Sequence, residues 1–208
     1  MSFTTIILAA GKGTRMKSPL AKVLHKVAGK TLIASVVDEF NQLGSTDTRV
    51  VISPEGKDIQ SHLKEKAVQF FTQKKPMGTA NAVSSAIDNK IEKFVIIANG
   101  DHPLLEAADL KKAVERFTSS NMDLCLLSCK IKTPGHFGRI VRDKNKFTRV
   151  VEFLDATAEQ KQIREVNTGI YFVKSSVLKE YLPLIKNNNS KKEFYLTDII
   201  QLLSLIHI

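Results

Sequence analysis

Apolar and polar positions along the chain follow two alternating periodicities. Short apolar runs rich in β-branched residues are typical of buried strands, and they occupy residues 4–10, 49–53, 67–71, 93–99 and 123–131. Apolar residues at helical spacing predict helices between these runs, over residues 31–44, 57–66, 77–88 and 107–117. Gly44 ends the first helix and is expected at its C′ position. Strands that alternate with helices predict a mostly parallel sheet covered on both faces.

The pattern changes after residue 135. Three further strands are predicted at residues 137–141, 147–154 and 168–173, with little helix between them apart from the polar segment 156–164. This arrangement indicates a β-rich lobe added to the sheet. The chain contains no internal repeat, low-complexity tract or linker, so a single domain with two lobes is the simplest interpretation.

The composition is that of a globular protein, but its charge is unevenly placed. Of the 208 residues, 43% are hydrophobic and 25% charged, and the formal net charge is +10. Residues 1–37 carry six basic side chains and no acidic one. An excess of this kind implies an anionic partner, such as nucleic acid, a membrane surface or a phosphorylated metabolite. The N-terminus has no basic n-region and no apolar run reaches a membrane span, so we expect a cytoplasmic protein.

Two cysteines, Cys125 and Cys129, are the only ones in the chain. This number excludes a disulfide framework and makes a cysteine-rich zinc site an unlikely interpretation. Both lie in one predicted strand, four residues apart, and would share a face of it. We therefore expect both thiols in the core.

Unusual residues follow three of the predicted strands. Ligands of doubly wound sheets bind beyond the carboxyl ends of the strands, and these ends carry GKGTRM, QKKPMGTA and NGDHPL. The first loop is neither a Walker A loop nor the dinucleotide fingerprint, because Met16 occupies the place of the third glycine. Its glycines can bring backbone N–H groups close to an anion. Lys12, Arg15 and Lys22 could then hold a triphosphate.

The segment LAAGKGTRMKSPLAKVLHKVAGK resembles the opening signature of the sugar nucleotidyltransferases, and most closely the uridylyltransferase domains that act on N-acetylglucosamine-1-phosphate. Further matches occur in the family's order, namely MGTANAV, GDHPLL, FGRIV, VVEFLDATAEQKQI, EVNTGIY and EFYLTDII. Together they cover nearly the whole chain. The resemblance implies a Rossmann-like nucleotide-diphospho-sugar transferase fold, a mostly parallel mixed sheet with a small β-rich sugar-binding lobe.

The resemblance also implies the nucleotide site. Arg15 and Lys22 match the residues that act on the α-phosphate, although Ala21 stands where the family usually has proline. The uracil-binding positions match Gln73, Gly78 and Thr79, with Pro76 and Asn81 replacing the usual glutamine and histidine. The implied nucleotide-binding residues are Leu8, Ala9, Ala10, Gly11, Lys12, Gly13, Gln73, Gly78 and Thr79.

Asp101 closes the fourth strand, and Mg²⁺ prefers one or two carboxylates together with substrate phosphate oxygens. The resemblance implies that Asp101 binds Mg²⁺, the expected cofactor. The implied sugar-phosphate side consists of Asn99, which replaces an aromatic residue common in the family, and of Gly138, Glu152, Asn167, Tyr195 and Thr197. Leu154 stands where the family often has a lysine, so a cation near the sugar phosphate is missing.

The implied reaction is attack by the sugar-1-phosphate on the α-phosphorus of UTP, with release of pyrophosphate, to supply a precursor of cell-wall polymers. Positioning and charge stabilisation would do most of the catalytic work. The expected partners are UTP and a sugar-1-phosphate, such as N-acetylglucosamine-1-phosphate, with no nucleic acid and no membrane. Self-association into a homo-oligomer is left open.

We expect a single domain over 1–208, with a nucleotide-binding part at 1–134 and a sugar-phosphate-binding part at 135–208. The tail after YLTDII does not resemble the family's continuation, which carries a second metal ligand, and no acetyltransferase β-helix follows. These observations favour a C-terminally truncated domain, or alternatively a natural short form completed by another subunit, and we expect weak or absent activity for these 208 residues alone.

Three alternatives remain at this stage. A relative that uses CTP or another sugar phosphate fits the departures at Pro76, Asn81, Asn99 and Leu154. A nucleotide-binding protein without catalysis fits the missing metal ligand. A nucleic-acid binder is suggested by charge alone, and the absence of Trp with only 3 Tyr argues against a stacking platform.

Overall fold

The computed structural model describes residues 2–11, 13 and 16–206. Its central feature is an 8-stranded sheet with a parallel half. In that half β1 (Thr4–Leu8) lies between β4 (Asp47–Ile52) and β6 (Phe94–Asn99), and β5 (Gln69–Thr72) pairs with the outer side of β4. All these pairs are parallel, so the carboxyl ends of the four strands lie along one edge of the sheet.

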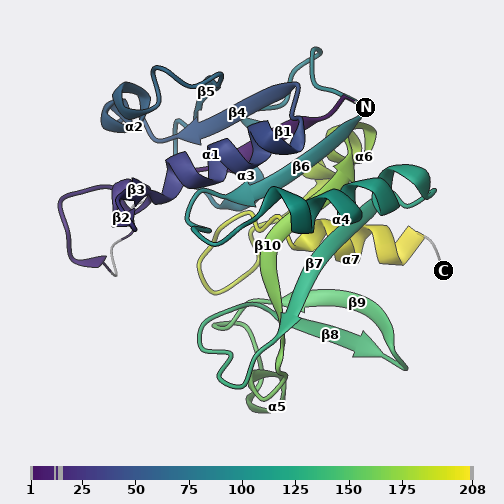
Figure 1. Ribbon diagram of the computed structural model, residues 1–208. Helices are drawn as coiled ribbons and strands as arrows, with labels where there is room; N and C mark the ends of the chain where they lie inside the picture. The colour runs from purple at the N-terminus through teal and green to yellow at the C-terminus, as the bar shows by residue number, and fades with distance from the viewer. Residues whose placement is uncertain (1, 12, 14–15, 207–208) are drawn as a thin grey trace.

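The rest of the sheet is antiparallel and leads into the lobe. β10 (Glu165–Lys174) pairs with β6 and with β7 (Leu124–Lys130), and its first residues pair with β8 (Arg139–Asp143), which pairs with β9 (Lys146–Val151). The β7–β10 register shifts between Asn167 and Tyr171, where Gly169 has a φ of 79°. Beyond this irregularity β8 and β9 extend away from the main sheet (Figure 1).

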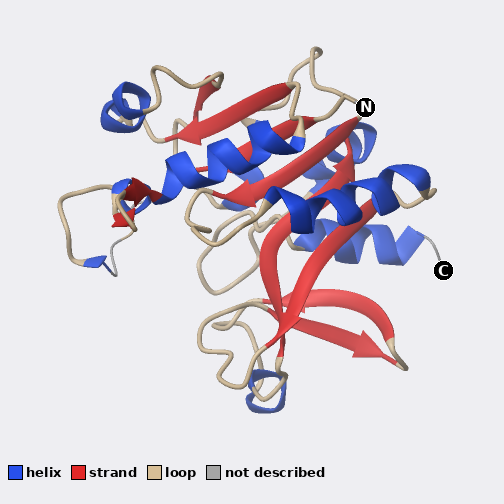
Figure 2. Cartoon of the chain, viewed as in Figure 1, coloured by secondary structure: helices blue, strands red, loops and turns tan. Residues whose placement is uncertain are grey.

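Helices cover both faces of the parallel half, as predicted. On one face α1 (Leu32–Leu43) and α4 (Ala107–Ser119) pack on Ile7; on the other, α3 (Thr79–Ser84), α6 (Ser175–Tyr181) and α7 (Asp198–Ile206) enclose Ile6 (Figure 2). Consecutive isoleucines therefore enter different cores, as the strand period of two requires. No described helix is long and apolar enough to cross a membrane.

α1 ends at the predicted residue, and a side-chain cap that was not predicted marks its start. The Thr31 side chain accepts a hydrogen bond from the Ala34 N–H at the start of the helix, and Gly44 ends it in the left-handed conformation with a φ of 96°. Thr31 also hydrogen-bonds His62 across 2.7 Å. His62 is the last residue of α2 (Lys57–His62), which ends four residues before the predicted position.

Several short elements were not predicted. A hairpin of β2 (Lys26–Val27) and β3 (Lys30–Thr31) turns through Ala28 and Gly29, both at positive φ. Two 3-10 turns, η2 (Lys22–Leu24) and η3 (Leu182–Leu184), and the helices α6 and α7 were also missed. The polar segment 156–164 contains α5 (Ala158–Lys161), which starts with a capping box formed by Thr157 and Gln160.

The prediction that both cysteines lie in the core is wrong for Cys129, which is exposed, while Cys125 is half-buried. β7 pairs with β10 outside the main path of the sheet, and its last three residues are exposed. An apolar run predicts a strand, but burial depends on what packs against each end of it.

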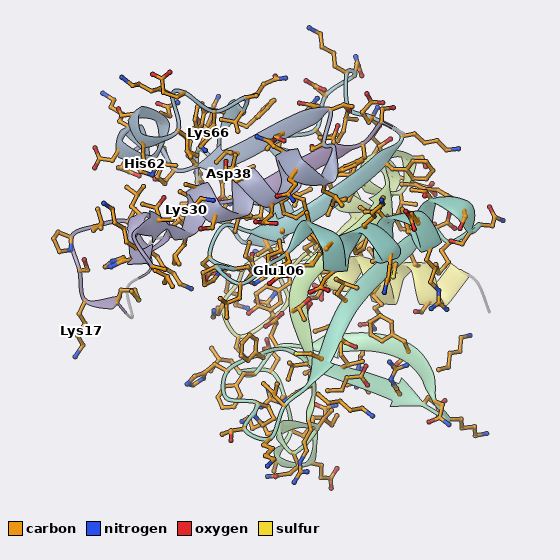
Figure 3. All side chains as sticks on the ribbon, in the orientation of Figure 1. Lys17, Lys30, Asp38, His62, Lys66 and Glu106 are labelled. Atoms are coloured by element: carbon orange, nitrogen blue, oxygen red, sulfur yellow. The ribbon has the colours of Figure 1, made fainter. Side chains whose placement is uncertain are left out.

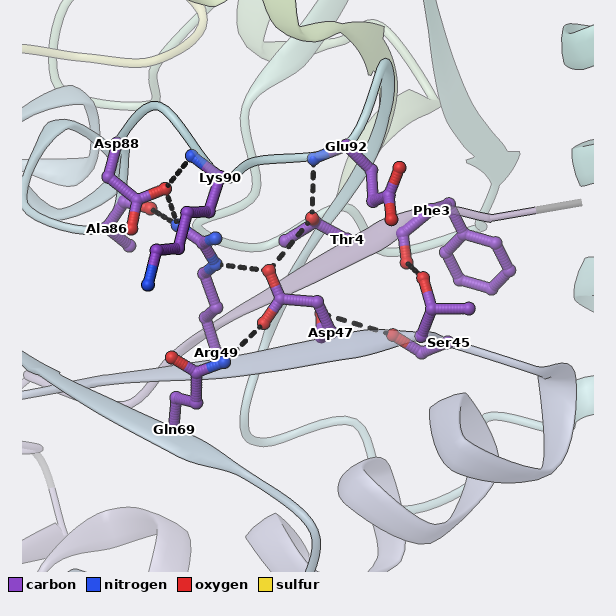
Figure 4. Close-up of polar contacts among 11 residues, drawn as sticks. Phe3, Thr4, Ser45, Asp47, Arg49, Gln69, Ala86, Asp88, Lys90 and Glu92 are labelled. Atoms are coloured by element: carbon purple, nitrogen blue, oxygen red, sulfur yellow. Dashed lines mark hydrogen bonds and ion pairs between the residues drawn. The ribbon is translucent and has the colours of Figure 1, made fainter.

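A buried charge network closes the end of the sheet opposite the strands' carboxyl ends (Figure 4). Arg49 in β4 is 1% exposed; it donates to Asp47 across 2.6 Å and to Asp88 across 2.9 Å. Asp47 also accepts hydrogen bonds from Thr4 and Gln69, each at 3.1 Å. The network thus joins β1, β4, β5 and the segment after α3.

Candidate functional site

The glycine loop starts where β1 and β6 end side by side. Leu8 is the register partner of Asn99, and the Gly100 N–H donates to the Leu8 carbonyl across 2.9 Å. Ala9 and Ala10 are buried, and Gly11 is exposed. Lys12 and Arg15, the other residues predicted for this loop, lie outside the described residues.

Lys22 packs directly against the loop. Gly13 has a φ of 60°, and a Cβ added there would lie 2.6 Å from the Cβ of Lys22. Only glycine therefore allows both this backbone conformation and this approach. The loop and the lysine, nine positions apart, form one surface.

Lys22 also forms an ion pair with Asp101, which follows β6. The side chains are 37% and 21% exposed, so the pair lies at the open edge of the sheet. The predicted catalytic cation and the predicted metal ligand thus meet, although 79 positions separate them.

His102, which sequence reasoning missed, lies beside this pair. Burial lowers the pKa of His102; the Asp101 carboxylate raises it less, and the Lys22 charge lowers it further. The imidazole is therefore biased toward its neutral form. Its place directly after Asp101 in NGDHPL was the only available signal.

The predicted base-binding residues form a second cluster at the end of β5. Gln73 is 6% exposed and donates from Nε2 to the Gly78 carbonyl and to Asn81 Oδ1, both across 3.0 Å. Thr79 Oγ1 accepts from the Leu196 N–H across 2.9 Å. This cluster is thereby attached to the segment that carries Tyr195 and Thr197.

Three predicted sugar-side residues come together in the lobe. The Asn167 N–H donates to the Gly138 carbonyl across 2.9 Å, and a Cβ added at Gly138 would lie 3.3 Å from Glu152 Oε1. The Asn167 side chain donates to the Tyr171 hydroxyl across 2.9 Å. Asn99, the last residue of β6 in the main sheet, places its side-chain amide where a Cβ at Gly169 would lie.

A cavity of about 450 Å³ opens beside Glu152 and Tyr195. Burial raises the pKa of Glu152; Lys191 lowers it less, and Asp155, Asp198 and Glu193 raise it further. The Tyr195 hydroxyl and Thr197 Oγ1 are buried without a hydrogen-bond partner in the described part of the chain. Of these two residues, Tyr195 lines the cavity. Leu154, where a lysine was expected, is 57% exposed.

The N-terminal charge excess is partly neutralised within the chain. Lys22 pairs with Asp101, and Lys30 pairs with Asp38 across 2.8 Å. Asp38 also pairs with Lys66 across 2.5 Å (Figure 3). Lys17 points away from the body of the molecule at the tip of its loop. Lys22 is thus both paired with a carboxylate and in contact with the glycine loop.

The fit to Mg²⁺ depends on the carboxylate of Asp101. Among residues 2–11, 13 and 16–206, no group of three His, Cys, Asp or Glu side chains is placed to hold a metal ion. Mg²⁺ is usually held by one or two carboxylates plus substrate phosphates and water, not by an all-protein cage. A single aspartate close to the glycine loop suits that mode.

Comparisons with known proteins identify the family of the chain. A family model described as a MobA-like NTP transferase domain matches residues 5–166. The bifunctional protein GlmU of Bdellovibrio bacteriovorus is 50% identical over 199 residues, which cover 96% of this chain and 43% of that protein. The chain therefore spans less than half the length of this relative.

Solved structures share the fold. A putative glucose-1-phosphate thymidylyltransferase from Bacillus anthracis, in complex with a sucrose, superposes with a TM-score of 0.81 at 24% identity, covering 100% of this chain and 84% of that one. UDP-glucose pyrophosphorylase complexed with UDP-glucose gives a TM-score of 0.78 at 16% identity and covers 99% and 88%. The predicted fold class, a nucleotidyltransferase fold with a mixed sheet, is confirmed.

Proposed function

The chain belongs to the nucleotidyltransferase family defined by the MobA-like NTP transferase domain, and from this premise we propose that it transfers UMP from UTP to N-acetylglucosamine-1-phosphate. The product would be UDP-N-acetylglucosamine, a precursor of cell-wall polymers, and pyrophosphate would be released. The similarity to GlmU supports this choice of substrates. The observation that carries the proposal is the contact of Lys22 with both Asp101 and the glycine loop at the carboxyl edge of the parallel strands.

In the proposed reaction a phosphate oxygen of the sugar-1-phosphate attacks the α-phosphorus of UTP. One P–O bond forms there as the bond to the bridging oxygen breaks, and the pyrophosphate takes both electrons of the broken bond. Lys22 would stabilise the negative charge that develops on the α-phosphate and the leaving group. His102, biased toward its neutral form, would add little charge to this region.

Asp101 would hold Mg²⁺, which when bound supplies positive charge against the phosphate oxygens. Lys22 and Asp101 neutralise each other in this structure, so substrate binding must separate them or share their charges. Once separated, Lys22 would bind a phosphate group and Asp101 would bind the cation.

The sugar would occupy the cavity beside Glu152. The Glu152 carboxylate accepts hydrogen bonds from hydroxyl or amide N–H groups, and the Tyr195 hydroxyl, which has no partner among the described residues, can donate or accept. A hexose with an N-acetyl group presents both kinds of partner. The pocket thus suits an uncharged, hydrogen-bonding ring.

A pyrophosphate-release assay tests the proposal. The chain is supplied with UTP, Mg²⁺ and one sugar-1-phosphate at a time, namely the N-acetylglucosamine, glucose and N-acetylgalactosamine forms, and UTP binding is measured separately by calorimetry. We expect UTP binding, and pyrophosphate release that is highest with N-acetylglucosamine-1-phosphate. A preference for another sugar phosphate would correct the substrate, and a chain that binds no UTP would overturn the proposal.

A further inference from the structure

The amide of Gln73 has no N–H left to offer a ligand. A glutamine amide carries two N–H donors and one acceptor oxygen. Nε2 donates to the Gly78 carbonyl and to Asn81 Oδ1, both across 3.0 Å. Within the described part of the chain no hydrogen bond reaches Oε1. Gln73 can therefore present only an acceptor.

The orientation of this amide is determined by its surroundings. The Gly78 oxygen is a backbone carbonyl and can only accept, so Nε2 and not Oε1 must face it. Gly78 cannot easily move: its φ is 106°, and a Cβ there would lie 2.5 Å from the Phe194 carbonyl oxygen. Hydrogen bonds from Phe194 N–H to Met77 O (2.7 Å) and from Ala80 N–H to Phe194 O (2.9 Å) hold both sides of it.

Asn81 engages the second N–H. It stands in the first turn of α3, and it is one of the positions where this chain departs from the family it resembles. We propose that Asn81 is a positioning residue that keeps Gln73 an acceptor-only group toward the nucleotide base, and so selects uracil over cytosine. The inference rests on the proposed function, in which the nucleotide is UTP.

The chemistry of the two bases explains the selection. In a nucleotide N1 is bonded to ribose, so the only N–H of uracil is at N3. An acceptor-only Oε1 that hydrogen-bonds uracil must therefore meet N3–H. Cytosine has an unprotonated acceptor at N3, and two acceptors would face each other there, leaving both unpaired. Cytosine's donor is the 4-amino group, one ring position away, so the base would have to shift to reach it.

Three variants test this by calorimetric titration of the full chain with UTP and with CTP. Asn81→Ala removes the acceptor and places a strong helix former in α3, so the variant is expected to fold. Asn81→Asp keeps an acceptor at the same place and serves as the conservative rescue. Lys26→Ala, on the exposed hairpin, is the matched control. The readout is the ratio of the CTP to the UTP dissociation constant, which a general loss of affinity does not change.

We expect Asn81→Ala to lower this ratio about threefold to tenfold, the size of one hydrogen bond, and Asn81→Asp to keep it within about twofold of the wild type. An unchanged ratio in Asn81→Ala would overturn the inference and leave the proposed function intact. An equal fall in both Asn81 variants would also overturn it, because packing and not the acceptor would then matter. Failure of the wild-type chain to bind UTP would overturn both.

Discussion

The two sides of the candidate site satisfy their polar groups differently. On the nucleotide side, Lys22 pairs with Asp101, and Gln73 bonds Asn81. On the sugar side, the hydroxyls of Tyr195 and Thr197 are buried without partners among the described residues. The first side is already paired, whereas the second holds groups that still lack a partner.

This difference indicates how each substrate would bind. A nucleotide would have to replace these existing contacts, so each new contact would add little net binding free energy. The selectivity for the nucleotide would then depend on which hydrogen-bonding groups of the site remain free. A sugar phosphate would satisfy oxygens whose burial costs about 1–3 kcal/mol each when unpaired.

The largest expected effect comes from breaking a paired charge in the parallel half. Arg49→Met leaves Asp47, whose side chain is 13% exposed, without its cation. Loss of one partner of a buried pair costs about 3–5 kcal/mol, so we expect unfolding by urea to begin at a much lower concentration. Arg142→Met is the control, because Arg142 pairs with Glu165 at 40% exposure and such pairs contribute about 0–1 kcal/mol. Equal losses of stability in the two variants would contradict the expected difference between a buried and an exposed ion pair.

The second effect concerns turnover. Lys22→Ala removes the cation that contacts the glycine loop, and we expect kcat to fall about 100-fold or more, by analogy with the loss of one charge-stabilising donor. Lys26→Ala, four residues along the chain, should keep wild-type turnover. Initial rates of pyrophosphate release with saturating substrates measure both. An unchanged kcat in the Lys22→Ala variant would show that Lys22 does not stabilise the reacting phosphates.

The third prediction uses pH. The folded-state pKa of Glu152 is raised, chiefly by burial, so ionised Glu152 opposes folding once the pH exceeds its ordinary value of 4.5. Glu152→Gln lacks this cost. We expect it to be more stable than the wild type by about 1 kcal/mol at neutral pH, an advantage that vanishes as the pH falls below about 4. Urea titrations across this range would show the difference growing with pH, and a constant difference would count against it.

A small stability effect of the opposite sign is expected at an unpaired group. Tyr195→Phe removes a buried hydroxyl that has no partner among the described residues, so the free energy of unfolding should rise by about 1 kcal/mol. Tyr171→Phe is the matched control, since that hydroxyl accepts from Asn167, and it should cost about 1 kcal/mol. The KM for sugar phosphate should rise severalfold in Tyr195→Phe while the KM for UTP stays unchanged. A Tyr195→Phe variant as unstable as Tyr171→Phe would show that the hydroxyl is paired after all.

Local patterns predicted much of the fold because the physics behind them is local. Apolar periodicity located the strands of the parallel half, and Gly44 ended α1 in the left-handed conformation that only glycine adopts at little cost. The hairpin of β2 and β3 was missed because its strands are two residues long, too short to show a period. α7 was missed although Asp198, Gln201 and Ser204 give it a polar side at helical spacing.

Local patterns could not predict which distant segments of the chain pair with one another. The run over residues 168–173 predicts a strand but not its neighbours, and only the folded chain places β10 between β6 and β8. The same is true of Cys129, whose exposure depends on what covers β7. His102 had no sequence pattern of its own and became notable only beside Lys22 and Asp101.

The sequence by itself determined the order of strands and helices, the glycine loop and the residue types available for a phosphate-transfer site. The tertiary structure alone decided that Lys22 meets Asp101, that Asn81 occupies the second N–H of Gln73, and that no residue it describes pairs with the buried Tyr195 hydroxyl. The physical reason is one of range. Periodicity and turn chemistry act over a few residues, whereas side-chain pairing and burial arise only when packing brings distant segments together.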